Sequence, residues 1–170
     1  ITNSELSDAG HSVIVIHGGT AEFTHCTIVN YYFYDIITGA TIQLPSIEET
    51  QAKGISAAFN NCLIAGNATP ISEGDLTGTQ IYFNSCMLNV EGADDNNFIN
   101  TYWGGQPHFM QIDRENYLYD YRIGSAESSA IGWGDPGYAT PPLDCDMYGV
   151  SRSEHVDVGA YQFVANEENE

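Results

Sequence analysis

Short apolar runs, interrupted by Gly, Asn and Thr, recur along the first two thirds of the chain. Residues 13–16 (Val-Ile-Val-Ile) and residues 80–83 (Gln-Ile-Tyr-Phe) are two of them. Runs of this length that are rich in β-branched and aromatic residues are typical of β-strands. The pattern therefore predicts a chain of many short strands joined by turns.

Three of these runs align on a cysteine, with Phe three positions before it and an aliphatic residue two positions after it. They are residues 23–28, 59–64 and 83–88. Residues 1–6 form a fourth, degenerate copy with Ser4 in the cysteine position. The copies begin at residues 1, 23, 59 and 83, so the offsets are 22, 36 and 24. The longest interval contains an insertion, residues 31–53.

A unit of 22 to 24 residues fits either a leucine-rich repeat or one coil of a parallel β-helix. The signature and the helical segment of leucine-rich repeats are absent from these units. Phe and Cys in each copy have opposite parity, so both point inward only if the two-residue period breaks between them. Asn60-Asn61 and Asn84-Ser85 occupy this break, and Asn tolerates left-handed backbone angles. The spacing therefore predicts a β-helix whose coils bend at these positions.

Stacked coils lie about 4.8 Å apart, so equivalent side chains are expected to form ladders along the axis. The predicted structural ladders are Phe23, Phe59 and Phe83, and Cys26, Cys62 and Cys86. With Cys145, four cysteines allow three disulfide pairings. Interior thiols are favoured over disulfides, because parallel neighbours in register rarely reach disulfide torsions. Catalytic or metal-binding cysteines are the third alternative.

The repeat fades after residue 106, and the remaining chain carries several motifs. They are Pro107-x-Phe109, Tyr117, residues 128–134, Asp146-x-x-Gly149-x-x-Arg152 and Asp157-x-Gly159-Ala160-Tyr161. Together with the Phe-x-x-Cys units, they resemble secreted bacterial right-handed parallel β-helix proteins of pectate-lyase-like fold with a choice-of-anchor-type ending. Ser129, Gly132 and Gln162 depart from that pattern, which has Pro, Asp and Glu there.

The resemblance implies an all-β fold, a right-handed parallel β-helix (solenoid) with a C-terminal capping region, located outside the cell or on the bacterial cell surface. Residues 1–106 would form the coils and residues 107–170 a last coil and cap. Arg152 is expected to hold the cap by pairing with Asp157 or Asp146. Because Ile1 falls within a coil, we also expect the chain to be the C-terminal part of a larger β-helix or to pair with another polypeptide.

The charge of the chain narrows the range of partners. The 170 residues include 4 basic and 23 acidic side chains, a formal net charge of −19. So negative a surface repels phosphates, which argues against nucleic acid and disfavours polyanionic substrates. No apolar run approaches the roughly 18 residues of a membrane span, so no membrane insertion by this segment is expected.

Catalytic and metal sites have little support in the sequence. Few basic residues are present to abstract a proton, which argues against a polysaccharide lyase in this segment. Asp94-Asp95 is the best candidate for a glycosidase carboxylate pair, and a solvated turn is the favoured alternative. Asp144-x-Asp146 with Gly149 only superficially resembles a calcium loop. No cofactor is expected, with Ca²⁺ as the one candidate metal.

Aromatic clusters give the better functional indication. Tyr31, Tyr32 and Tyr34 open the insertion, and Tyr102-Trp103 precedes two glycines. Exposed rings bind sugar faces, although packing over coil ends is an alternative role for both clusters. We therefore expect a glycan-binding or adhesive surface protein, non-catalytic in this segment, whose partner is a polysaccharide or cell-surface glycan. One alternative is a carbohydrate-active enzyme, either a polysaccharide lyase or a glycoside hydrolase, with its catalytic groove upstream or near residues 94–103. The other is a purely structural stalk.

Overall fold

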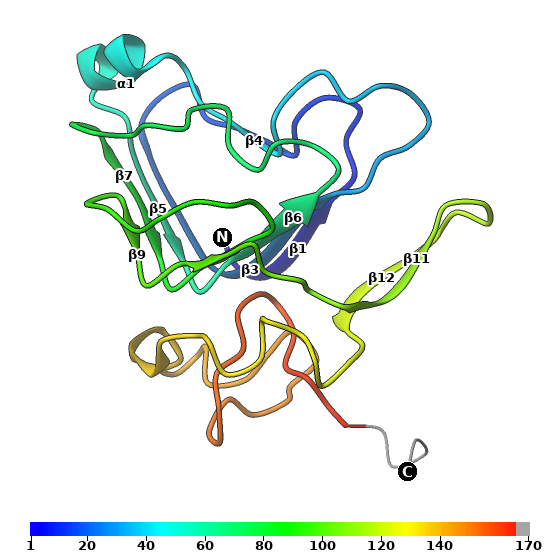
Figure 1. Cartoon of the computed structure of the whole chain (residues 1–170). Helices are drawn as coiled ribbons and strands as arrows, with labels where there is room; N and C mark the ends of the chain where they lie inside the picture. Colours follow the sequence, from blue (N-terminus) through cyan, green and yellow to red (C-terminus); the bar gives the residue numbers. More distant parts are fainter. Residues whose placement is uncertain (166–170) are drawn as a thin grey trace.

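The computed structural model describes residues 1–165 and shows a predominantly β protein built on one large, strongly curled parallel sheet (Figure 1). All-β is therefore the class of the fold, and the curled sheet is compatible with a β-solenoid. The end of the predicted cap, residues 166–170, lies outside the described residues.

The curled sheet has eight parallel strands. Seven of them lie side by side in the order β10 (Tyr102–Trp103), β8 (Met87–Leu88), β6 (Leu63–Gly66), β3 (Thr20–Asn30), β5 (Ser56–Asn60), β7 (Gln80–Asn84) and β9 (Phe98–Ile99). The eighth strand, β1 (Thr2–Ser7), pairs with β3. The first half of the long strand β3 pairs with β5 and its second half with β6. The curl therefore arises within the coils, because each coil bends at the same place.

One residue at each bend has a left-handed backbone conformation. These residues are Asn3 (φ 44°), His25 (φ 53°), Asn61 (φ 49°), Ser85 (φ 49°) and Asn100 (φ 54°). Non-glycine residues adopt this conformation rarely, and Asn and His are among those that tolerate it best. The predicted break in strand periodicity between Phe and Cys is confirmed.

The bends also show a fifth copy of the repeat, residues 98–103, which the sequence alignment misses. Phe98 pairs in register with Phe83, and Trp103 with Leu88. Thr101 takes the cysteine position, and the copy starts only 15 residues after the previous one (98 − 83). The altered residue and the short offset together conceal this copy from an alignment on cysteine.

The phenylalanines at the repeat positions stack through the interior. Ring centroids are 4.8 Å apart for Phe23 and Phe59, 4.6 Å for Phe59 and Phe83, and 4.9 Å for Phe83 and Phe98, and the rings are within 10° of parallel. This spacing equals the distance between neighbouring strands in a sheet, so the rings follow the backbone ladder.

The repeat cysteines lie beside this stack as buried free thiols. Each thiol donates to the backbone carbonyl of the residue in the Phe position of the preceding coil, at distances of 3.2 to 3.7 Å. The pairs are Cys26 to Ile1, Cys62 to Phe23, and Cys86 to Phe59. Of the alternatives left open by the sequence, the structure therefore shows interior thiols.

The interval of residues 31–53 contains regular structure. β4 (Ile42–Gln43) pairs in parallel with β2 (Ile14–Val15), and both lie across the core from the curled sheet. The helix α1 (Ile47–Lys53) follows, with Ser46 as its N-cap and Gly54 in a left-handed C-cap. The residues added to this coil are thus divided between the loop before β4 and the helix after it.

The C-terminal region begins with an antiparallel hairpin, β11 (Phe109–Asp113) and β12 (Leu118–Ile123). It continues as irregular chain with one short 3₁₀ helix, Pro136–Tyr138. Figure 1 shows this region along the outer side of the curled sheet. There, apolar side chains from both parts form a second core: Val29, Leu63, Ala65, Met87, Tyr121, Ile123, Ala130 and Val158.

The C-terminal region reaches the last coil, where Trp133 donates to Asn100 O at 2.9 Å, and it also extends over earlier coils. Ala160 N donates to Thr27 Oγ1 at 3.0 Å, and Gly159 N donates to Asn61 O at 2.8 Å, so the C-terminal region crosses several coils from outside. The physical reason is that the strands after the bends carry apolar residues on both faces, and the outer face needs covering.

Candidate functional site

Four aromatic side chains gather where residues 32–34 meet the tip of the β11–β12 hairpin. We call Tyr32, Phe33, Tyr34 and Tyr117 the aromatic patch. Tyr34 and Tyr117 stack with centroids 5.0 Å apart and an interplanar angle of 11°, and Phe33 lies 6.2 Å and 6.3 Å from them. Tyr34 is 63% exposed and Tyr117 56% exposed. Exposed apolar patches of this kind mark contact sites for ligands or partners.

Local turn chemistry presents these rings. Asn30 is fully buried, and its Oδ1 accepts from Tyr32 N at 3.2 Å, which sets the direction of the chain as it leaves β3. At the hairpin tip, Asp113 Oδ1 accepts from Asn116 N at 3.0 Å. Tyr117 then takes φ 58°, a left-handed conformation that turns its side chain onto Tyr34. The patch is therefore held by backbone geometry on both of its sides.

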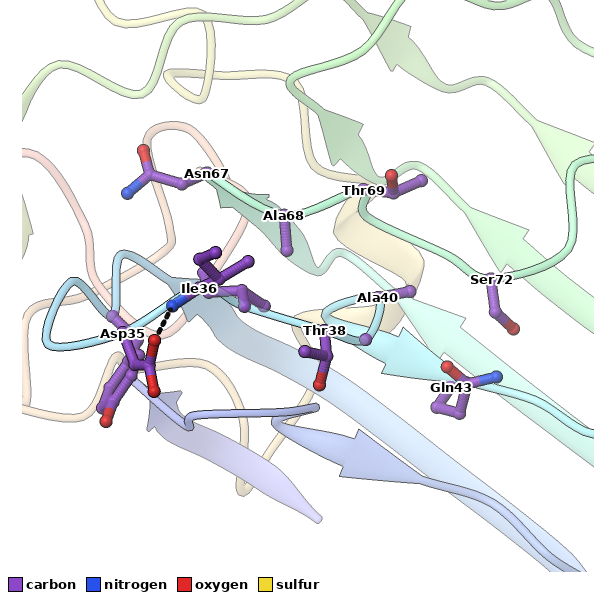
Figure 2. Close-up of a pocket in the computed structure, with 12 residues that line it drawn as sticks. Asp35, Ile36, Thr38, Ala40, Gln43, Asn67, Ala68, Thr69 and Ser72 are labelled. Carbon is purple, nitrogen blue, oxygen red and sulfur yellow. Dashed lines mark hydrogen bonds between the residues drawn. The ribbon is translucent and has the colours of Figure 1, made fainter.

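A groove of about 650 Å³ adjoins the patch, and Figure 2 shows the two chain segments that form it, residues 35–43 and 67–72. Six of its twelve lining residues are polar and uncharged, and Asp35 is the one formally charged lining residue. The polar lining residues are Tyr32, Asp35, Thr38, Gln43, Asn67, Thr69 and Ser72. Because Tyr32 belongs to both features, patch and groove form one continuous surface.

Arg114 connects the hairpin to this surface. Its Nη2 donates to Asn67 Oδ1 at 2.7 Å, and its guanidinium lies 6.0 Å from the centroid of the Phe33 ring. Within residues 1–165, no carboxylate lies within 4.0 Å of Arg114, whereas Lys53 and Arg122 each pair with one. Arg114 thus ties the groove rim to the patch and brings an uncompensated positive charge there.

Of the five predicted ligand residues, Tyr32 and Tyr34 belong to this surface and Tyr31 faces away from it. Tyr31 stacks on Tyr121 at 5.8 Å and meets Phe109 edge-on at 6.0 Å. Burial raises the pKa of the Tyr31 hydroxyl. Tyr31 therefore packs the C-terminal region against the sheet, as in the alternative role considered from the sequence.

Tyr102 and Trp103 lie at the end of the coil stack. Tyr102 meets Trp133 edge-on at 4.9 Å, while Trp103 packs on Phe98 at 4.9 Å and donates through Nε1 to Asp94 at 3.0 Å. Both residues belong to the last coil, in which Tyr102 packs against the second core and Trp103 against the interior core. The structure does not bring them together with the aromatic patch.

The two carboxylates of the candidate pair Asp94-Asp95 accept hydrogen bonds from nearby N–H groups. Asp94 Oδ1 accepts from Thr101 N at 3.1 Å as well as from the Trp103 indole, and Asp95 Oδ1 accepts from Phe98 N at 2.9 Å. Asp95 Oδ1 also accepts from Asn97 N at 2.7 Å, two residues on, as is typical of an Asx turn. Both carboxylates are therefore engaged in shaping the loop that precedes the last coil.

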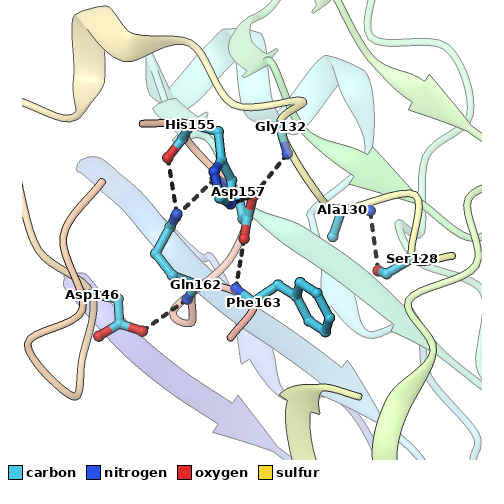
Figure 3. Close-up of polar contacts among 8 residues, drawn as sticks. All are labelled: Ser128, Ala130, Gly132, Asp146, His155, Asp157, Gln162 and Phe163. Atoms are coloured by element: carbon cyan, nitrogen blue, oxygen red, sulfur yellow. Dashed lines mark hydrogen bonds and ion pairs between the residues drawn. The ribbon is translucent and has the colours of Figure 1, made fainter. Parts of the chain in front are cut away.

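Asp157 is the centre of a buried polar network in the C-terminal region (Figure 3). Its carboxylate accepts from Gly132 N at 2.8 Å and from Phe163 N at 2.6 Å, and it contacts His155 Nε2 at 3.3 Å. Asp157 N donates to Gln162 Oε1 at 2.8 Å. The network joins residues that lie up to 31 positions apart (163 − 132).

The predicted ion pair of Arg152 with Asp157 or Asp146 is wrong, since the described residues show neither within 4.0 Å. Arg152 is buried and donates to the backbone carbonyls of Leu143, Cys145 and Gly159. Asp157 and Asp146 already accept from backbone N–H groups, and the buried guanidinium donates to backbone carbonyl oxygens instead.

Residues 1–165 contain no cluster of three or more His, Cys, Asp or Glu side chains placed to bind a metal. In the candidate calcium loop, Asp146 Oδ1 accepts from Tyr148 N and Val150 N, both at 2.8 Å. None of the helices in this part of the chain has the length and apolar character needed to cross a bilayer.

No protein-family model, curated protein or solved structure matches this chain.

Sequence reasoning missed Tyr117, Arg114 and the groove. Tyr117 and Arg114 lie in a hairpin about 80 positions after Tyr34, and no local pattern shows that the two segments meet. The turn residues 113–116 (Asp-Arg-Glu-Asn) did carry a signal, because they predict a tight turn with the next residues at an exposed tip.

Proposed function

We propose that the curled sheet is part of a right-handed parallel β-helix. Two observations support this: strands of successive coils pair in parallel and in register, and all coils bend at one repeated position. The resemblance of the C-terminal motifs to secreted bacterial β-helix proteins agrees with it. A larger β-helix, or a partner polypeptide at the free edge of β1, belongs to the same proposal.

We propose further that the protein binds a polysaccharide or cell-surface glycan at the outside of a cell and that this segment is not catalytic. The observation that carries the proposal is the aromatic patch beside an open polar groove. Tyr rings offer an apolar face to the C–H groups of a sugar, and the groove offers hydrogen-bonding groups to its hydroxyls.

The alternative function, a carbohydrate-active enzyme with its catalytic groove upstream or near residues 94–103, makes a different prediction. Asp94 and Asp95 are held by backbone N–H groups and the Trp103 indole, which argues against an acid and base pair at this place. An enzyme would release reducing ends or unsaturated products from the glycan that it binds.

A glycan array with the whole chain, followed by product analysis on each glycan bound, tests the proposal. We expect binding without product release, and loss of binding in the double variant Tyr34→Ala/Tyr117→Ala. Tyr148→Ala is the matched control, because Tyr148 is 66% exposed but stacks on Tyr161 in the C-terminal region. Product release would favour the enzyme, and absence of binding to every glycan would favour a structural stalk.

A further inference from the structure

We infer that the aromatic patch and the groove select an uncharged polysaccharide whose pyranose units carry mainly equatorial hydroxyls, and that they exclude polyuronates. This inference rests on the proposed function and deepens it by naming the class of ligand. In the arrangement we propose, one sugar unit lies on the free face of the Tyr34 or the Tyr117 ring and the following units lie in the groove.

The patch accounts for the shape of the sugar. Because Tyr34 and Tyr117 stack face to face, the free face of each ring is the one turned away from its partner ring, and the stacking holds both rings in place. A pyranose with equatorial hydroxyls presents flat C–H faces that match the face of one ring, whereas axial hydroxyls would bring polar groups against the ring and lose hydrogen bonds to water. Phe33 contacts both rings, and Arg114 lies over Phe33.

The groove accounts for the preference for hydroxyl groups. Asn67 Oδ1 accepts from Arg114, and in the described part of the chain the Nδ2 group of the Asn67 side chain makes no hydrogen bond. Gln43 Nε2 donates to Leu44 O, which leaves Gln43 Oε1 to accept. Uncharged amides that both donate and accept suit hydroxyl groups, which do the same.

Charge accounts for the exclusion of uronates. Asp35 in the groove and Arg114 at its rim carry opposite charges, so the repulsion comes from the net charge of −19 of the whole chain. A polyuronate carries one negative charge per sugar unit and is repelled as it approaches. The Debye length shortens from about 30 Å at 0.01 M salt to about 3 Å at 1 M, so this repulsion is strongest at low ionic strength.

Affinity electrophoresis of the whole chain tests the inference with uncharged xyloglucan, mixed-linkage β-glucan and glucomannan, and with polygalacturonate and alginate. We expect retardation by at least one uncharged polymer and none by the two polyuronates. Titration calorimetry with a hexasaccharide of the best uncharged polymer should then give an affinity that changes less than twofold between 20 mM and 500 mM NaCl.

The variants separate the contributions of the rings and the groove. Tyr34→Ala and Tyr117→Ala should each weaken binding of the hexasaccharide about tenfold, as expected for loss of a stacking surface worth about 1 kcal/mol or slightly more. Tyr148→Ala should leave it unchanged, and Asn67→Ala should weaken it. Thermal unfolding of each variant checks that these exposed substitutions leave the fold intact.

Each contrary result has a distinct meaning. Tighter retention by polygalacturonate or alginate than by any uncharged polymer would overturn the inference and leave the proposed function standing. Binding that persists in Tyr34→Ala and Tyr117→Ala would overturn the location of the site. No retention by any of the five polymers, together with a negative glycan array, would overturn the proposed function as well.

Discussion

Single residues at the coil bends determine where the sheet curls and where the C-terminal region binds. Asn61 shows both effects: its backbone is left-handed, and its side chain donates to Asp135 O at 2.9 Å and accepts from Asp135 N at 2.8 Å. The Asn-Asn pair made this bend predictable from the sequence. His25 and Ser85 occupy equivalent positions, and only the repeat alignment identified them, because neither residue type specifies a turn so clearly.

His25 should make the fold sensitive to mild acid. It is fully buried at its bend, with Nε2 3.3 Å from Tyr138 O and 3.4 Å from Asn61 Nδ2. Burial and the charge of Arg152 lower its pKa from 6.5 to about 4. The unfolded chain therefore takes up this proton near pH 6.5 and the native protein only near pH 4, so stability decreases as the pH falls through that window.

The expected loss from His25 is about 3 kcal/mol between pH 7 and pH 4, from the size of the pKa change. Urea unfolding at pH steps across this range measures it. His25→Asn keeps a residue that tolerates the left-handed bend but cannot titrate, so its stability should depend less steeply on pH. An equal pH dependence in wild type and variant would contradict the assignment.

At the scale of elements, the repeat made most of the curled sheet predictable. The positions of Phe and Cys fixed the register of β3, β5, β6, β7 and β8, which the strand pairing reproduces. The last coil was missed, since Thr101 and a short offset conceal it. The outer contact surface was also missed, although Leu63-Ile64-Ala65 is apolar on both faces and thus carried the signal of a strand covered on two sides.

Phe59 should contribute most among the stacked rings, because it is fully buried with a ring on either side, at 4.8 Å and 4.6 Å. We expect Phe59→Ala to lower the free energy of unfolding by about 3–5 kcal/mol, as for other buried Phe truncations. Denaturant titration measures this, and Tyr82→Ala, whose ring is 38% exposed on the neighbouring strand, is the control with an expected loss of less than about 1 kcal/mol. An equal decrease in the free energy of unfolding in the two variants would show that the stacked, buried position of Phe59 adds no stability.

At the scale of the whole molecule, long-range contacts place the candidate site and could not be predicted. The aromatic patch needs the hairpin tip to reach Tyr34, and the hairpin is placed by the second core on the outer face of the sheet. Local patterns in the sequence indicate that the outer face is covered, but they do not show which segment covers it. Sequence reasoning therefore found half of the patch and assigned the same potential role to Tyr31, Tyr102 and Trp103, which have packing roles.

The net charge of −19 should limit the stability of the native protein through repulsion among its carboxylates. We expect the Tm at pH 7 to rise by several degrees as NaCl increases from 10 mM to 1 M, because the Debye length falls from about 30 Å to about 3 Å. Differential scanning calorimetry measures this. Repeating the series at pH 4.5, where more carboxylates are protonated, should give a smaller rise, and an equal or larger rise there would contradict the explanation.

The C-terminal region along the outer face has a consequence for cooperativity. Tyr161 donates to Glu5 at 2.6 Å in the first coil, and Trp133 donates to Asn100 O at 2.9 Å in the last, so one segment contacts both ends of the stack. In repeat proteins whose units touch only their neighbours, coils can be added or unfold separately. Here one segment is bonded to the first and the last of the described coils, so no described coil can separate from the stack without breaking its contacts to that segment. We therefore expect the described coils to unfold together in one transition.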